Sequence, residues 1–197
     1  MVPPRGDGVT AEVMPETMGV RGTDHGHIVF ERAPVPVENR LGEEGDGLSI
    51  ALSGFLAPSR IAVGMTCVGL AARALELAVA YAQTRETFGK PIASRQAIAF
   101  RLAEMATDLR AARSLVLDAA RLWESSGGAG MESAMAKLYA SEMLQRVTDG
   151  ALQVHGGIGY WSSTPIERVY RDARAQRFEE GTAEIQKTVI ARELLRP

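Results

Sequence analysis

The chain has 197 residues, of which 46% are hydrophobic and 23% charged, so it can bury a core and is not an intrinsically disordered protein. Its length allows one domain with a small appendage. The formal net charge is −2 and both signs are mixed along the chain, which excludes the concentrated basic surface of a nucleic-acid-binding protein. The single cysteine, Cys67, excludes a disulfide framework. It suits a buried position in a reducing compartment.

The first 45 residues predict a small amount of β-structure. Short β-type runs at 8–13, 26–31 and 35–37 are separated by turns rich in glycine. Two or three such strands are too few to form a stable sheet alone. We therefore divide the chain into residues 1–45, a β-remnant with its linker, and residues 46–197. The first residues lack the apolar segment of a secretory signal, and we expect a cytoplasmic protein.

From residue 48 onward the pattern is helical. Residues 48–84 are rich in alanine, and Pro58 predicts a break or kink. The most apolar part, 61–77, carries Arg73 and Glu76 and is shorter than the roughly 20 residues that cross a bilayer. We therefore expect a buried helix and no membrane span.

Further helices are predicted at 92–123, at 131–154, from near Pro165, and at 182–195. In the first of these, apolar residues alternate at spacings of four and three, as in a bundle seam. This stripe consists of Ile98, Leu102, Met105, Leu109, Ala112, Val116, Ala119 and Trp123. In the helix at 131–154, the expected apolar positions are Met135, Leu138, Leu144, Val147, Ala151 and Val154. The sequence thus predicts a mainly α fold, an antiparallel four-helix up-down bundle after a short β-hairpin.

Two adjacent carboxylates, Glu179 and Glu180, precede a Gly-Thr step at the start of the last predicted helix. Gly181 lets the backbone turn tightly or approach a ligand, Thr182 can cap the helix, and Glu184 lies in its first turn. A carboxylate held at such a junction can have its pKa raised toward neutrality, as a general base requires. The same residues also fit a helix N-cap with two solvated acids. The local pattern leaves both interpretations open.

Residues 171–174, Arg-Asp-Ala-Arg, and residues 180–186, Glu-Gly-Thr-Ala-Glu-Ile-Gln, resemble the C-terminal signature of the flavin-dependent acyl-CoA dehydrogenases. Further segments resemble this family in the right order, at 18–24 with 30–42, at 59–60, at 85–96 and at 153–160. The resemblance extends from about Met18 to Arg196. It also implies a partial chain, because members of the family carry an N-terminal helical domain and a complete β-domain before the position of Met1.

The resemblance implies specific roles around the Glu-Gly-Thr segment. Glu180 matches the base that removes the α-proton of an acyl-CoA thioester. Arg60 would steer that base or the thioester, and Glu179 and Gly181 would contact the substrate. Glu179 stands where the family usually has tyrosine or another apolar residue. We expect it to face solvent; recognition of a polar or cationic acyl group is the alternative. Ser59 matches the position of the base in some relatives and cannot serve.

The implied cofactor is FAD. Its predicted contacts are Arg85, Thr87, Phe88, Gln96, Gln153, Gly156, Gly157, Thr182 and Glu184. Glycines leave room for backbone amides to approach a pyrophosphate. A Rossmann loop is disfavoured, because a helix precedes these glycines and Gly-x-Gly-x-x-Gly is absent. In the family, residues of the Arg85 and Gln153 type reach the flavin of a neighbouring subunit, which implies a homo-oligomer, a dimer or tetramer. His25 and His27 have no evident third ligand, so no metal is expected.

The resemblance predicts α,β-dehydrogenation of an acyl-CoA, with electrons passed to an electron-transferring flavoprotein. Two alternatives remain open. One is a non-catalytic helical oligomerisation module, or one subunit of a split enzyme. The other is an acyl-CoA oxidase-like flavoenzyme that delivers electrons to oxygen.

Overall fold

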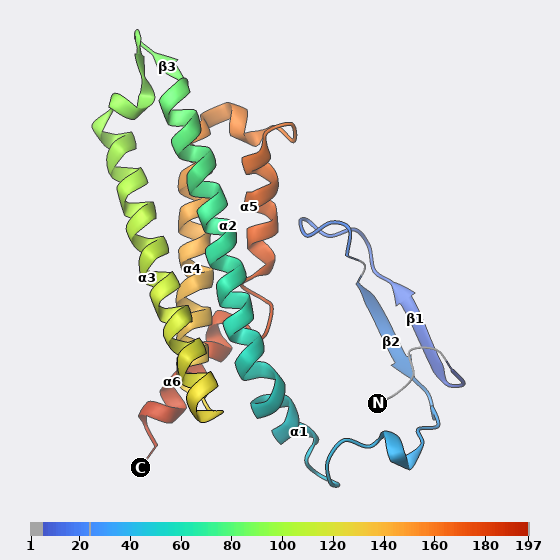
Figure 1. Cartoon of the computed structure of the whole chain (residues 1–197). Coiled ribbons are helices and arrows are strands. Elements are labelled where there is room, and N and C mark those ends of the chain that lie inside the picture. Colours follow the sequence, from blue (N-terminus) through green and yellow to red (C-terminus); the bar gives the residue numbers. More distant parts are fainter. Residues whose placement is uncertain (1–5, 24, 197) are drawn as a thin grey trace.

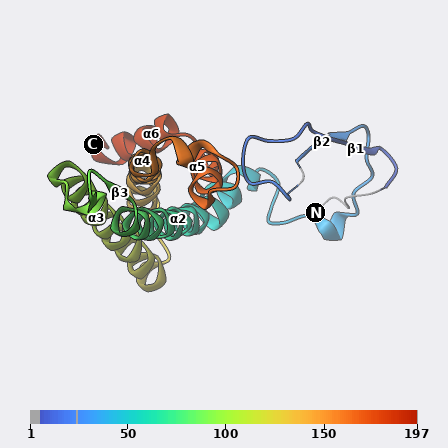
Figure 2. The ribbon, with the colours of Figure 1, turned by 90° about the horizontal axis from the view of Figure 1, so that it is seen from above.

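The structure is a computed structural model that describes residues 6–23 and 25–196. Three long helices lie side by side, each antiparallel to the next (Figure 1): α2 (Ala57–Thr84), α3 (Gln96–Ser126) and α4 (Gly130–His155). The shorter α5 (Pro165–Ala175) returns along α2 and α4, and α6 (Ala183–Leu194) packs against α4 at the other end. Figure 2, along the bundle, shows α4 between α3 and α5. The predicted mainly α fold is confirmed.

The first helical stretch changes its winding instead of breaking at Pro58. The short α1 (Gly47–Ser49) continues into a π-helical segment, η2 (Ile50–Leu56), and α2 begins one residue before Pro58. Proline lacks an N–H and its ring clashes with the carbonyl four residues earlier, so the wider π-turn accommodates it. The helix expected from residue 92 begins at Gln96, after a 3-10 turn, η3 (Ile92–Ser94).

Small residues fill the contact between α2 and α4. The buried face of α2 carries alanine at positions 57, 71, 74, 78 and 82, and α4 buries alanine at 134, 136, 140 and 151. A Cβ on Gly64 of α2 would lie 3.8 Å from the main chain of Ala136 on α4 and 2.9 Å from a methyl group of Val116 on α3. Close backbone approach therefore defines this core, which we call the alanine seam.

The predicted stripe of α3 lies on the core, except for Trp123 at its end, which is only partly buried. Met105, Ala112, Val116 and Ala119 are buried, and Ile98, Leu102 and Leu109 pack against the core at its margin. In α4, the predicted Leu144, Val147, Ala151 and Val154 are buried, whereas Met135 and Leu138 are only partly buried. The buried line in that half of α4 runs instead through Ser133, Lys137 and Ala140.

By length and composition, the helical stretch Gly47–Thr84 is sufficient to cross a membrane, with a mean hydropathy of 1.6 over its most apolar window. The sequence-based expectation considered only the most apolar part, 61–77, which lies within this longer helical stretch. A buried core helix passes the same test, and α2 packs against α3, α4 and α5. The absence of a membrane span remains a prediction.

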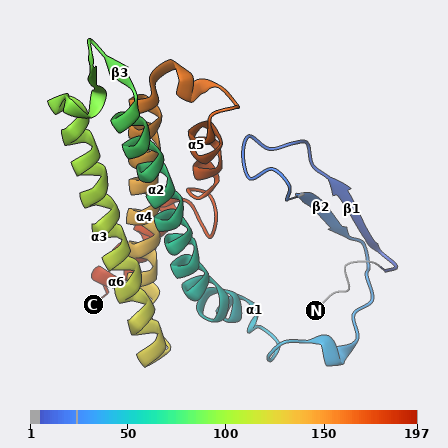
Figure 3. The same ribbon diagram turned by 45° about the horizontal axis from the view of Figure 1, so that its top comes forward.

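The N-terminal part is a two-stranded antiparallel hairpin. β1 (Val9–Val13) pairs with β2 (Gly26–Phe30), and Val9 lies opposite Phe30. The third β-type run, 35–37, forms no strand, because Pro34 and Pro36 cannot donate to a ladder; a 3-10 turn, η1 (Val37–Asn39), follows. The hairpin stands beside the bundle (Figure 3).

The turn of this hairpin is attached to α5. The Arg171 guanidinium donates to the carbonyl of Met18 at 2.7 Å, and the N–H of Val20 donates to the Asp172 carboxylate at 2.7 Å. Between them Gly19 is buried, and a Cβ there would lie 2.6 Å from the main chain of Arg171. The absence of a side chain at Gly19 therefore permits this docking.

Candidate functional site

The loop between α5 and α6 holds the two predicted carboxylates. We call residues 176–182 the base loop. Glu180 has φ +53° and Gly181 has φ +98°, so two successive residues have left-handed backbone conformations. For a residue other than glycine, this conformation costs about 1–2 kcal/mol. The surrounding structure must therefore hold Glu180 in place.

Three buried side chains from three helices hold the base loop through its carbonyls. Gln186 Nε2, on α6, donates to the carbonyls of Glu180 at 2.9 Å and Gly181 at 3.0 Å. Arg60 Nε, on α2, donates to the Glu180 carbonyl at 3.3 Å. Lys137 Nζ, on α4, donates to the carbonyl of Gly181 at 2.7 Å and to that of Arg177 at 3.2 Å.

Burial sets the protonation equilibria around this loop. Desolvation lowers the pKa of the Lys137 ammonium, although the charge of Glu179 opposes this. Desolvation also lowers the pKa of Arg60, against the charge of Glu180. It raises the pKa of the Cys67 thiol to about 12. The predicted buried thiol at Cys67 is confirmed, since this residue is fully buried and free.

The carboxylates of the base loop differ in their surroundings. Glu180 is half-buried, whereas Glu179 is exposed and accepts a hydrogen bond from Gln176 Nε2 at 3.3 Å. Thr182 occupies the N-cap of α6, but its side chain makes no capping hydrogen bond. Glu184 is exposed. A hydrogen bond from its own backbone N–H lowers the pKa of this carboxyl below its usual range, and a hydrogen bond from the Thr182 hydroxyl lowers it further.

A second group of predicted residues meets at the far end of the bundle. An open hollow of about 530 Å³ there has Arg85, Thr87, Gly156 and Gly157 in its lining. Arg85 is exposed at the C-cap of α2, and Thr87 lies in the short hairpin of β3 (Glu86–Thr87) with β4 (Lys90–Pro91). No atom lies within 4 Å of where a Cβ would stand on either glycine, so a ligand could approach this backbone closely.

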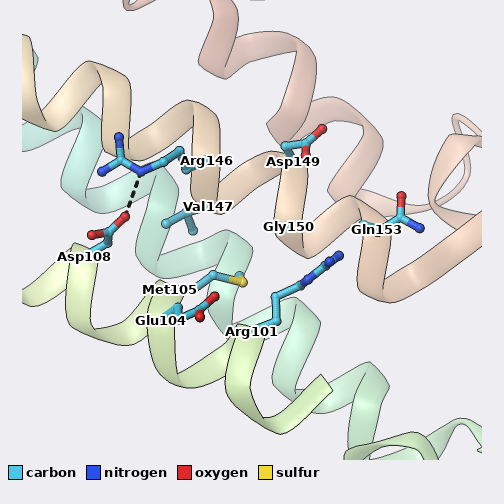
Figure 4. Close-up of a pocket in the computed structure, with 9 residues that line it drawn as sticks. All are labelled: Arg101, Glu104, Met105, Asp108, Arg146, Val147, Asp149, Gly150 and Gln153. Carbon is cyan, nitrogen blue, oxygen red and sulfur yellow. Dashed lines mark hydrogen bonds and ion pairs between the residues drawn. The ribbon is translucent and has the colours of Figure 1, made fainter. Parts of the chain in front are cut away.

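Three more predicted cofactor residues are exposed at the same end, whereas Thr182 and Glu184 lie at the start of α6. Phe88 is 97% exposed, with φ +51°, at the tip of the β3–β4 hairpin. Gln96 is the first residue of α3. Gln153 lines a neighbouring groove between α3 and α4 together with Arg101 (Figure 4). Farther along that groove, Arg146 and Asp108 form an ion pair at 2.9 Å.

His155 lies beside this second group. It is buried, its Nδ1 lies 2.8 Å from the carbonyl of Ala151, and its ring stacks on Tyr81. This arrangement is that of a histidine fixed at a helix end. Among the residues that the structure describes, no group of three or more metal-ligating side chains is suited to hold a metal ion.

The two groups of site residues lie at opposite ends of the bundle, as the positions of β3 and α6 in Figure 1 show. Lys137, which contacts the base loop, and His155, which precedes Gly156, are 18 positions apart on α4. This corresponds to about 27 Å at roughly 1.5 Å per residue. One chain therefore presents two separate surfaces and not one closed pocket.

Sequence reasoning missed Lys137 and Gln186, although a signal for Lys137 is present. Ser133, Lys137, Ala140, Leu144 and Val147 follow the alternating spacing of four and three that marks a buried seam. A lysine in such a line is unusual, because lysine is almost never fully buried unless it is paired. Gln186 is the last residue of the 180–186 signature, but the sequence assigns no role to it, since a glutamine near a helix start is ordinary.

Comparisons with known proteins identify the family of this chain. The family model described as acyl-CoA dehydrogenase, C-terminal domain, matches residues 45–195. Acryloyl-CoA reductase (NADH) of Anaerotignum propionicum is 47% identical over 179 residues, which cover 91% of this chain and 45% of the relative. The structure of butyryl-CoA dehydrogenase from Megasphaera elsdenii has a TM-score of 0.92 and 39% identity, and the match covers 96% of this chain and 49% of that one.

An acyl-CoA dehydrogenase from Bacillus anthracis, solved in complex with FAD, has a TM-score of 0.92 and 34% identity, covering 99% of this chain and 37% of that one. The chain spans about half the length of the first two proteins. The residues that match the family model include the base loop, Gly156 and Gly157. The chain therefore belongs to the acyl-CoA dehydrogenase family, and its residues 45–195 correspond to the C-terminal domain of that family.

Proposed function

We propose that this chain contributes the base and part of the cofactor site to a flavoenzyme that interconverts an acyl-CoA and its α,β-unsaturated counterpart. The main support for this proposal is the way in which the base loop fixes Glu180. The loop holds the half-buried Glu180 in a left-handed conformation through buried donors on three helices. A structural loop gains nothing from fixing a strained glutamate, whereas a general base needs a fixed position.

Glu180 would accept the α-proton of the thioester in the oxidative direction and return it in the reductive direction. The hydrogen on the carbon next to a thioester carbonyl is only weakly acidic. Its transfer is therefore slow unless the carboxylate is held close to it, so the position of Glu180 controls the rate of proton transfer. Glu179 cannot substitute for Glu180 in this arrangement, because it is exposed and hydrogen-bonded to Gln176. Relatives that act on acryloyl-CoA and butyryl-CoA support a short acyl group as the substrate.

The residues at the far end fit a dinucleotide. Arg85 offers a cation to a diphosphate, and Gly156 and Gly157 leave the backbone open beside it. The N-terminus of α3 lies at the same end and adds positive potential. FAD, when bound, supplies the acceptor for the hydride of the β-carbon. We propose Thr87, Phe88, Gln96 and Gln153 as further contacts.

The separation of the two surfaces supports a homo-oligomer. The base loop and the Arg85 surface are too far apart to serve neighbouring atoms of one ligand, so the Arg85 surface would complete the cofactor site of a second copy. An electron-transferring flavoprotein is the proposed partner in electron transfer.

Exchange of the α-proton of butyryl-CoA with deuterated water tests the proposal directly. The assay uses the chain with FAD, both alone and combined with the N-terminal half of the Megasphaera elsdenii dehydrogenase. Glu180→Gln should slow exchange by about 10²–10⁴-fold. Glu179→Gln, the matched control, should retain the parent rate. Equal rates for Glu180→Gln and the parent would refute the proposal.

The acceptor is tested in the same preparation. Anaerobic bleaching of the flavin by butyryl-CoA, with little peroxide formed in air, is expected of a dehydrogenase. Rapid release of peroxide in air would instead favour the oxidase-like alternative. A preparation that neither retains flavin nor exchanges the proton would favour the oligomerisation module.

A further inference from the structure

The proposed function treats Lys137 only as one of three donors to the base loop, alongside Arg60 and Gln186. The Lys137 side chain is completely buried in the seam of α4, and it bonds to two main-chain carbonyls, on Gly181 and Arg177. Burial of an ammonium group without a directly bonded carboxylate is costly. A methionine would fill similar space without that cost. The chain therefore contains a charge that packing alone does not require.

We propose that Lys137 is a positioning residue for Glu180, which fixes both ends of the base loop and thereby directs the carboxylate toward the α-carbon of the substrate. This inference rests on the proposed function of Glu180 as the base. Lys137 reaches the loop at Arg177, before the two acids, and at Gly181, directly after them. These contacts restrain the segment that carries Glu180 from both sides.

The other two donors restrain a smaller part of the loop. Gln186 holds the adjacent carbonyls of Glu180 and Gly181, and Arg60 holds the Glu180 carbonyl alone at a longer distance. If Lys137 were replaced, the Gly181 carbonyl would keep Gln186 as its donor, whereas the Arg177 carbonyl would lose the donor that Lys137 provides. The expected consequence is a base loop that stays folded but moves more.

Small displacements of a base have large effects on proton transfer. A misplacement of about 1 Å can reduce a rate by roughly 10²-fold, while substrate binding depends little on such a shift. A positioning role therefore predicts a fall in kcat with KM preserved. A purely structural role predicts loss of folded protein and equal specific activity in the molecules that remain folded.

Lys137→Met removes the charge and both hydrogen bonds to the base loop, and it keeps a long apolar side chain. Thr148→Val is the matched control, since Thr148 is also buried on α4 but bonds to Leu144 in its own helix. Lys137→Arg retains a cation with donors, and serves as the second variant if Lys137→Met does not fold. Each variant is measured for butyryl-CoA α-proton exchange at saturation, for KM, for melting temperature and for backbone amide exchange of residues 178–182.

We expect Lys137→Met to lower kcat by about 10- to 100-fold, with KM nearly unchanged and faster amide exchange confined to the base loop. Lys137→Arg should retain a higher kcat than Lys137→Met and slower amide exchange in the base loop. Thr148→Val should match the parent in kcat and in amide exchange. Unchanged kcat and unchanged amide exchange in Lys137→Met would overturn the inference, as would a loss of rate that only follows the loss of folded protein.

Failure of the inference can be distinguished from failure of the proposed function. If Glu180→Gln exchanges the substrate proton at the parent rate, the proposed function is wrong, and with it the positioning role. Amide exchange of the base loop would then still show whether Lys137 holds the loop. If Glu180→Gln is inactive while Lys137→Met equals the parent, the proposed function stands and only the positioning role is refuted.

Discussion

Gly181→Ala should destabilise the chain by about 2–3 kcal/mol. At φ +98° an alanine is strained by roughly 1–2 kcal/mol. Its Cβ would also lie 3.1 Å from Gln186 Nε2 and 3.1 Å from a methyl group of Ile185. The displaced Nε2 is the atom that donates to the carbonyls of Glu180 and Gly181, and weakening these hydrogen bonds adds about 1 kcal/mol.

Urea denaturation of the parent and the variant measures this difference as a shift in midpoint at constant slope. Gly69→Ala provides a control with the opposite sign. Gly69 is exposed within α2, and no atom lies within 4 Å of the place where its Cβ would stand, so alanine there should stabilise the helix by roughly 0.5–1 kcal/mol. A free energy of unfolding for Gly181→Ala within about 0.5 kcal/mol of the parent would refute the account of the base loop.

Three further predictions concern other parts of the chain. Gly19→Ala should detach the hairpin from α5, because no space exists beside the main chain of Arg171; proteolysis before residue 46 should become faster, while Gly47→Ala should behave as the parent. Arg171 holds the pKa of Glu167 below its usual range, so this pair stabilises the fold above the ordinary carboxyl pKa, and the stabilisation is lost as the pH falls through the lowered value. As the pH is lowered, the free energy of unfolding of Glu167→Gln should therefore fall less than that of the parent, by about 1 kcal/mol or less. The same pH dependence in both proteins would contradict this. Cys67, fully buried with a pKa raised to about 12, should resist a thiol reagent at neutral pH until urea unfolds the chain, and rapid labelling of the native chain would contradict its burial.

The helices and much of the core could be predicted from sequence, because their signals are local. The spacing of apolar residues in α3 and the later part of α4 identified positions that are buried in the structure. The sequence predicts two or three N-terminal strands. The run at 35–37 forms none, because β-type composition there is outweighed by the two prolines at 34 and 36. The prediction for the early part of α4 failed because the buried seam there contains a serine and a lysine, which periodicity of apolar residues cannot detect.

The site was predicted less completely, because its geometry depends on contacts between distant segments. The motif around Glu180 located the base loop, but the donors that hold it lie on α2, α4 and α6. Arg60 is separated from Glu180 by 120 positions in the sequence. Such a contact is created by the packing of the bundle, and no spacing within the motif encodes it.

The alanine seam limits how this chain can vary. Where two main chains touch through single methyl groups, a larger side chain cannot fit, and overpacking of this kind costs about 1–3 kcal/mol. Loss of a methyl group leaves a void too small for water. Sequence drift along α2 and α4 should therefore be confined to their outer faces, where new surface chemistry can arise without any change in the distance between the two helices.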